Sequence, residues 1–186
     1  MADPTPSTRD RLIHSGVTLF QERGFHGTSV ADILTAAQAP KGSLYHHFPA
    51  GKADLARAAA HLASDLMLDI IARAYDPAED FSGGTVRMCE KLARLFERQA
   101  HWRACPVQTL FLDGPLDRAE GERLLQSWID ATQAQGLRLH GPAPLTDAQR
   151  IWATLIGCWT FARIRGDAAP LRNMPDLLTL GETRSA

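Results

Sequence analysis

Apolar residues recur at intervals of three and four along most of the chain, whereas strand-like alternation of apolar and polar residues is nearly absent. That spacing is typical of helices that bury one face. The first helix is expected to be capped by Ser7 or Thr8 and to end at Arg23, with Gly24 as a left-handed terminator. The pattern therefore predicts an all-α fold that begins with an amphipathic helix.

Two short helices are expected next, before residue 50. The second follows Ser29, whose spacing from Asp32 fits a capping box. Pro40 interrupts the pattern, and the third helix is expected from near Lys41 to about His47. Two helices joined by a tight turn form a helix-turn-helix, in which the later helix enters the major groove of DNA.

Beyond residue 50 the elements are longer. A helix is expected from about Ala50 toward Tyr75, and residues 76–85, which contain Pro77, Gly83 and Gly84, are expected to form a loop. Further helices are expected at 86–103, 105–112, 116–135, 146–165 and about 170–180, with the Gly/Pro-rich connection GLRLHGPAP before residue 146. The helix at 146–165 is apolar on nearly all faces, which is typical of a helix buried on both sides.

Composition narrows the class of protein. The chain has 186 residues, 45% of them hydrophobic, and a formal net charge of −1, so bulk charge does not indicate a nucleic-acid binder. The N-terminus MADPTPSTRDRL lacks the apolar core of a signal peptide, and no apolar run approaches the about 18 residues of a membrane helix. No membrane partner is therefore expected. Three separated cysteines without a CxxC pair favour a reduced, cytoplasmic compartment.

The stretch KGSLYHHF, residues 41–48, concentrates hydrogen-bonding groups at the start of the third helix. A helix N-terminus favours phosphate, and Gly42 allows a sugar–phosphate backbone to come close. Tyr45, His46 and His47 project from the next turn, and their donors suit phosphate oxygens and base edges. This cluster indicates a double-stranded DNA operator as the partner.

The segment GFHGTSVADILTAAQAPKGSLYHHFPAGKADL resembles the TetR family of transcriptional regulators over residues 24–55, without a gap. The resemblance implies that Thr28 and Ser29 contact phosphates, and that Lys52 contacts a phosphate from the start of the fourth helix. It also implies that Lys41, Ser43, Tyr45 and His46 face DNA. Together with Gly42 and His47, the expected DNA-binding residues are Thr28, Ser29, Lys41, Gly42, Ser43, Tyr45, His46, His47 and Lys52.

One position departs from the family pattern. Members of the family usually carry Gly where this chain has Gln38. Left-handed backbone costs energy for a residue with a side chain, so either the turn differs or Gln38 is slightly strained. The phrase FPAGK, together with Ala104-Cys105-Pro106-Val107 and the ending GCWTFARIRGDAAPL, resembles the LmrA/YxaF-like branch of the family.

Metal-binding and enzymatic alternatives have little support. His46 and His47 point about a hundred degrees apart on a helix, and His101 and Cys105 have no evident third ligand. The Glu-x-x-His pairs of di-metal helical proteins are absent, as are HExxH, GxSxG, GxGxxG and GxxxxGK[ST]. We therefore expect no metal, no cofactor and no enzymatic activity.

The C-terminal part is rich in aromatic residues, each of which singly is best explained as core. The family usually has a pocket among these helices, and apolar walls with few polar groups fit a small hydrophobic or aromatic ligand. The pocket candidates are Trp102, Cys105, Gln108, Phe111, Trp128 and Trp152.

Dimerisation has its own physical argument, because helix-turn-helix dimers read half-sites about 34 Å apart or a multiple of that. The helix at 146–165 has an apolar face to spare, and pairing it with the last helix across a two-fold axis would bury Ile156, Trp159 and Phe161 or their neighbours. Which face takes which role is left open.

The sequence thus predicts an N-terminal three-helix helix-turn-helix domain, residues 1–50, followed by a larger effector-binding and dimerisation domain, residues 51–186. The expected function is a ligand-responsive repressor that acts as a homodimer on a palindromic operator and is released by a small hydrophobic or aromatic effector. The long helix from Ala50 is the expected lever between the two parts. The sequence does not fix whether ligand releases or promotes DNA binding.

Overall fold

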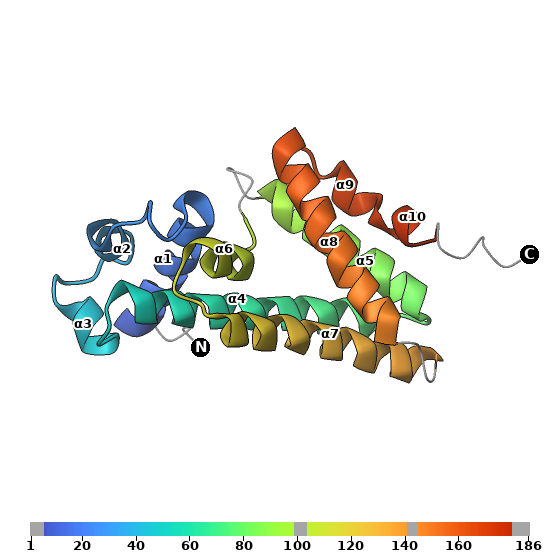
Figure 1. Cartoon of the computed structure of the whole chain (residues 1–186), viewed down its shortest axis with the longest axis horizontal. Helices are drawn as coiled ribbons and strands as arrows, with labels where there is room; N and C mark the ends of the chain where they lie inside the picture. Colours follow the sequence, from blue (N-terminus) through green and yellow to red (C-terminus); the bar gives the residue numbers. More distant parts are fainter. Residues whose placement is uncertain (1–5, 99–103, 141–144, 180–186) are drawn as a thin grey trace, which may run out of the picture. The chain divides into compact units, whose positions relative to one another are not determined.

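A computed structural model describes residues 6–98, 104–140 and 145–179 (Figure 1). All regular structure in these ranges is helical, which confirms the predicted all-α class. The helices are α1 (Thr8–Arg23), α2 (Val30–Ala36), α3 (Ser43–His47), α4 (Lys52–Tyr75), α5 (Phe81–Arg98), α6 (Pro106–Asp113), α7 (Arg118–His140), α8 (Leu145–Arg165), α9 (Ala169–Arg172) and α10 (Met174–Thr179).

The helices belong to two compact units. Unit 1 comprises residues 1–65 and 104–124, and unit 2 comprises residues 66–103 and 125–186. Helices α4 and α7 each contribute residues to both units. The boundaries of these units differ from the functional division predicted at residue 50. That functional division stays a prediction.

The ends of α1 and α2 match the expected signals. Ser7 caps α1 by accepting a hydrogen bond from the N–H of Asp10 at 3.1 Å, and Gly24 follows the helix at φ 72°. Ser29 and Asp32 form the predicted capping box of α2. The hydrogen bond from the Ser29 side chain holds the pKa of Asp32 below its usual value.

The turn between α2 and α3 places Gln38 in left-handed backbone, at φ 49°. The N–H of Gln38 donates to Thr35 O at 3.1 Å and the N–H of Ala39 to Leu34 O at 2.9 Å, which together form a Schellman motif. The usual turn is therefore kept with a residue that has a side chain. Of the two alternatives stated above, the strained one is found.

The core of unit 1 joins the first four helices to α6. Leu12, Phe20, Ile33 and Leu44 are fully buried there, together with Leu55 from the first turn of α4. Helix α6 lies beside α1 (Figure 1). The segment before α6 is tied to α1 in both directions, because the Gln21 side chain donates to Ala104 O at 3.2 Å and the Ala104 N–H donates to Gln21 O at 3.4 Å.

Unit 2 packs α8 against α9 and α10, and α5 against the same two short helices. Its largest fully buried side chains include Tyr75, Met88, Leu92, Phe96 and Trp152. Helices α9 and α10 replace the single helix expected at 170–180, since the chain interrupts its helix at Asn173.

The loop predicted at 76–85 is wrong in its second half, because α5 already begins at Phe81. The N–H of Gly83 donates to the Asp80 carboxylate at 2.6 Å, so Asp80 caps the helix. Gly84 lies within the helix against the Tyr75 ring, and a Cβ there would be 2.2 Å from Cδ1 of Tyr75. This glycine serves close packing rather than a turn.

The end of α7 and the burial of α8 also differ from expectation. Helix α7 continues past Gln135 to His140, and its extension is anchored by Arg138, which donates to Tyr75 O at 2.8 Å. Helix α8 is not buried on both sides, because Phe161 and Ile164 are 58% and 76% exposed. The end predicted for the helix at 86–103 lies outside the described residues, which place the last turn of α5 at Arg98.

The two glycines of α5 give a prediction with opposite signs. Ala is favoured over Gly in a helix by about 1 kcal/mol, so Gly83→Ala, whose Cβ would meet only the flexible Asp80 side chain at 3.2 Å, is expected to stabilise the protein slightly. Gly84→Ala is expected to destabilise it by about 1–3 kcal/mol, because the methyl group overlaps the Tyr75 ring. Urea denaturation of both variants checks this, and two stabilised variants would contradict it.

Candidate nucleic-acid interface

Helix α3 holds two side chains in the core and turns others outward. Leu44 is fully buried and Phe48, directly after the helix, is 3% exposed. Tyr45 is 63% exposed, and His46 is exposed beside it. This arrangement anchors the helix firmly while leaving polar aromatic side chains available at its surface.

The two histidines of α3 differ in their surroundings. The rings of His46 and His47 meet edge to face with centroids 4.8 Å apart, and His47 is partly covered by Phe48, whose ring centroid lies 6.5 Å away. The guanidinium of Arg9, on α1, lies 5.5 Å from the centroid of the Phe48 ring. The outward surface thus mixes aromatic rings with hydrogen-bonding nitrogens.

The expected start of the helix at Lys41 is replaced by a turn. Lys41 and Gly42 are exposed and precede the helix, and the N–H groups of Gly42 and Ser43 both donate to Pro40 O, at 3.1 and 3.0 Å. These two N–H groups are therefore already paired. A Cβ on Gly42 would meet no atom within 4 Å, so the approach to this turn is open.

Thr28 and Ser29 use their hydroxyl groups within the protein. Thr28 is 1% exposed, and its hydroxyl lies 2.8 Å from Gly24 O and 3.2 Å from Leu19 O. The exposed Ser29 donates to the Asp32 carboxylate at 2.7 Å. Their predicted phosphate contacts stay predictions, and the hydroxyl of Thr28 has no exposed surface with which to make one.

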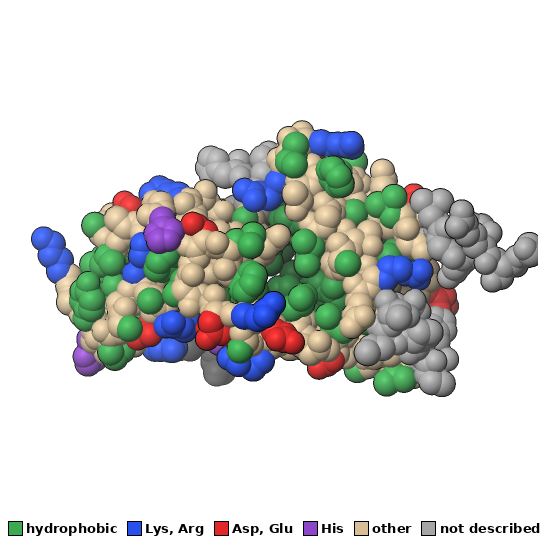
Figure 2. All heavy atoms as spheres, in the orientation of Figure 1, with side chains coloured by type: hydrophobic (Ala, Val, Ile, Leu, Met, Phe, Trp, Pro, Cys, Tyr) green, Lys and Arg blue, Asp and Glu red, His purple; other side chains and the backbone are tan. Residues whose placement is uncertain are grey.

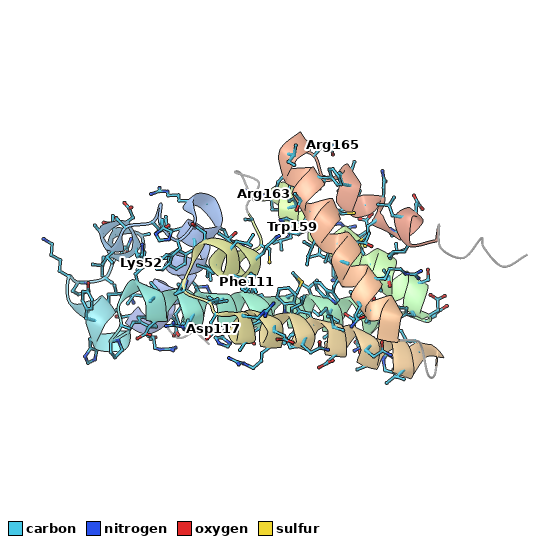
Figure 3. All side chains as sticks on the ribbon, viewed as in Figure 1. Lys52, Phe111, Asp117, Trp159, Arg163 and Arg165 are labelled. Carbon is cyan, nitrogen blue, oxygen red and sulfur yellow. The ribbon has the colours of Figure 1, made fainter. Side chains whose placement is uncertain are left out.

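Lys52 also has partners within unit 1 (Figure 3). Its ammonium group donates to Phe25 O at 2.9 Å and to Thr28 O at 3.0 Å, and it lies 4.2 Å from the centroid of the Phe25 ring. Two of its three N–H donors are thereby used. Spacing along the chain does not reveal these hydrogen bonds, because they join residues more than twenty positions apart.

On the face drawn in Figure 2, basic and acidic side chains are interspersed over the described residues rather than gathered into one basic patch. Near α2, Arg23 and Asp32 lie 3.6 Å apart and partly neutralise each other. Any recognition of DNA here therefore depends on particular side chains more than on a strong electrostatic field.

The five pocket candidates that lie within the described residues belong to both units. Cys105 is the N-cap of α6, with its thiol pKa raised by burial, and Gln108 is half-buried on the same helix. Phe111, 44% exposed, covers Gly121 of α7, where a Cβ would lie 2.8 Å from the phenyl ring (Figure 3). Trp102 lies outside the described residues.

Trp128 and Trp152 come together in unit 2. Their ring centroids are 5.0 Å apart, and the two residues are 4% and 2% exposed. The Trp152 indole N–H donates to Trp128 O at 3.2 Å and to the Thr132 hydroxyl at 3.0 Å. The pairing of these two candidates is thus observed, whereas a pocket that includes all six stays a prediction.

The predicted dimer residues on α8 differ in exposure. Trp159 is 8% exposed and packs edge-on against Phe96 at 5.5 Å, Ile156 is half-buried, and Phe161 is 58% exposed. Figure 3 shows Trp159, Arg163 and Arg165 along the C-terminal half of this helix. Ile164, which the sequence reasoning did not single out, is the more exposed apolar residue at 76%.

Metal sites and membrane-spanning helices are the two other features relevant to function. Within residues 6–98, 104–140 and 145–179, no three His, Cys, Asp or Glu side chains are grouped so that they could hold a metal ion. His101, the possible partner of Cys105, is outside those ranges. None of the described helices is long and apolar enough to cross a membrane.

Known proteins resemble this chain in both sequence and fold. Residues 12–59 match the family described as bacterial regulatory proteins, tetR family. The uncharacterised HTH-type transcriptional regulator YxaF of Bacillus subtilis (strain 168) is 30% identical over 139 residues, which cover 72% of each chain. The HTH-type transcriptional repressor DhaR of Mycobacterium sp. (strain GP1) is 30% identical over 129 residues, 67% of this chain and 63% of that protein.

The fold is found again in solved structures. The crystal structure of the regulatory protein TetR from Rhodobacter sphaeroides superposes with a TM-score of 0.79, covering 92% of this chain and 96% of that one. The sequence identity of this pair is 22%, so the likeness concerns the fold. The arrangement of helices described here therefore has an experimentally determined counterpart.

Proposed function

The chain belongs to the TetR family of transcriptional regulators, and from this premise we propose that it is a repressor that binds a palindromic operator as a homodimer. Members of this family are DNA-binding transcription factors rather than enzymes. The related DhaR is a repressor, which supports repression as the direction of control. We place the protein in the cytoplasm, where its DNA partner is.

The observation that carries this proposal is the exposed surface of α3 and the turn before it. Lys41, Tyr45 and His46 are exposed, while Leu44 and Phe48 on the opposite side are buried. A short helix held this firmly presents its side chains with little loss of entropy on binding. Tyr45 and His46 supply the base and phosphate contacts, and Lys41 supplies a phosphate contact.

Dimerisation is assigned to the exposed face of α8. Phe161 is more than half exposed, and it lies on the same helix as the still more exposed Ile164. Covering such apolar side chains with a second copy removes them from water. Two α3 helices related by a two-fold axis then read two half-sites about 34 Å apart or a multiple of that.

A small hydrophobic or aromatic effector is proposed to release the repressor. Each unit by itself holds candidate residues for such a site: Cys105, Gln108 and Phe111 at α6 in unit 1, and Trp128 and Trp152 in unit 2. Helix α4 carries residues of both units, which makes it the proposed lever. Effector binding shifts the population toward a conformation whose α3 helices do not match adjacent major grooves.

The test is selection of duplex DNA from a random pool by the purified protein, followed by binding measurements at several salt concentrations. We expect a palindromic sequence bound by a dimer, with affinity about 10³-fold or more above that for random DNA. Equal affinity for selected and random duplexes would contradict specific recognition. Binding of one protomer per site would contradict the homodimer.

A further inference from the structure

The start of α1 lies beside α3 in unit 1 (Figure 1). Arg9, in the first turn of α1, places its guanidinium 5.5 Å from the centroid of the Phe48 ring, and Phe48 directly follows α3. On α3 itself the neighbouring ring is that of His47, whose centroid lies 6.5 Å from that of Phe48. A single ring, that of Phe48, therefore links the Arg9 side chain to the side chains of α3.

The guanidinium of Arg9 has hydrogen-bonding capacity to spare. Arg9 is exposed, and no hydrogen bond ties its N–H groups to another of the described residues. A guanidinium has five N–H donors at its edge, and a contact with an aromatic ring leaves those donors available. The Phe48 ring therefore holds the charge at the surface without using its hydrogen bonds.

The turn of α1 that carries Arg9 is fixed in place. Ser7 caps the helix, and its hydroxyl also donates to the Asp10 carboxylate at 2.6 Å. The side chain of Arg11 donates to the C=O of Ala37, the C-cap of α2, at 3.0 Å. The acidic neighbour of Arg9 is thus directed to the helix cap, and the turn is anchored to the helix-turn-helix.

We propose that Arg9 binds a phosphate of the operator from the start of α1, beside the end of α3. The inference rests on the proposed function and deepens it, because it assigns a DNA contact to a helix outside the helix-turn-helix. Lys41, exposed in the turn before α3, flanks the other end of that helix. Two cations therefore flank α3, where they contact the phosphate backbone that borders the groove.

Arginine suits this contact for two reasons. Its planar fork binds two phosphate oxygens at once, which a lysine ammonium does not do. The Phe48 ring also restricts the side chain before DNA arrives, so less conformational entropy is lost on binding. A phosphate contact carries no sequence information, so Arg9 adds affinity for every duplex, whereas Tyr45 and His46 read the bases.

The salt dependence of DNA binding tests the phosphate contact. Affinity falls with rising salt, and the slope of log affinity against log salt decreases in magnitude by about 0.9 for each phosphate contact that is lost. A dimer that loses one contact in each protomer should therefore lose about 1.8 of its slope. We expect Arg9→Met to show this loss and to bind the selected and random duplexes alike about tenfold more weakly.

Two further variants serve as controls. Arg123→Met removes an exposed positive charge of unit 1 from α7, so it has the same effect on net charge. It is expected to change affinity by less than about twofold with an unchanged slope, because salt screens charges that do not contact DNA. Arg9→Lys keeps the charge but not the planar fork, so it should keep the slope and lose part of the affinity.

Circular dichroism and thermal unfolding establish that each variant is folded before its affinity is compared. If Arg9→Met matches Arg123→Met in affinity and slope, the phosphate contact is overturned while the repressor function stands. Weaker binding with an unchanged slope would also overturn it, because Arg9 would then act only through its packing on Phe48. If the unmodified protein binds no selected DNA, the proposed function itself fails, and this inference fails with it.

Discussion

Replacement of Tyr45 by Ala is expected to weaken binding to the selected operator about 10- to 100-fold, because a lost side-chain contact to DNA costs about 1–3 kcal/mol. Tyr45 is 63% exposed, and its ring rests on Gly51, where a Cβ would lie 3.0 Å from Cε1. The residue thus projects from α3 in a fixed direction. Because so much of it is exposed, its removal should lower the free energy of unfolding by less than about 1 kcal/mol.

Tyr45→Phe is the matched control, since it keeps the ring against Gly51 and removes only the hydroxyl. Equal losses for Phe and Ala would assign the effect to a hydrogen bond from the hydroxyl, whereas a loss only for Ala would assign it to ring contacts with DNA. Fluorescence anisotropy with labelled duplex measures both. An Ala variant that binds as tightly as the unmodified protein would contradict the assignment of α3 as the recognition helix.

Local signals predicted the N-terminal helices well because their ends depend on neighbouring residues. Ser7, Gly24 and the Ser29–Asp32 capping box act over three or four positions, so the sequence contains each complete signal. At Gln38 the departure from the family pattern left two alternatives, a different turn or a strained residue, and the structure has the residue in left-handed backbone. Leu44 and Phe48 are four positions apart, the spacing at which one face of a helix recurs, and both are buried.

The errors arose where a residue's role depends on distant parts of the chain. Gly84 was interpreted as part of a loop, although it is the site where the Tyr75 ring packs onto α5. The internal hydrogen bonds of Lys52, to the carbonyl groups of Phe25 and Thr28, could not be inferred from spacing, whereas its predicted phosphate contact stays a prediction. The hydrogen bond from the Phe25 N–H to the Asp113 carboxylate was not foreseen either, since 88 positions separate the two residues.

The candidate effector site was predicted by residue type, which does not distinguish a pocket wall from core. Aromatic residues are enriched in both, and the sequence does not locate empty space. The structure pairs Trp128 with Trp152 and satisfies the indole N–H of Trp152 within unit 2. A residue packed in the core loses more stability on truncation than one that borders open space, so a stability measurement distinguishes the two roles.

Trp152→Ala is expected to lower the free energy of unfolding by about 3–5 kcal/mol, a large share of the about 5–15 kcal/mol that stabilises a typical domain. The residue is 2% exposed, so its removal leaves a cavity beside Trp128 and frees the Thr132 hydroxyl from one partner.

Trp152→Phe keeps an aromatic ring and loses the two N–H hydrogen bonds, so it should cost about 1–2 kcal/mol. Thr132→Val should cost about 1 kcal/mol, because the indole N–H retains the Trp128 carbonyl. Denaturant unfolding at one fixed protein concentration gives all three values, since a dimer's stability depends on concentration. A loss below about 1 kcal/mol for Trp152→Ala would mean that the ring borders open space, and this result would favour the pocket over the core.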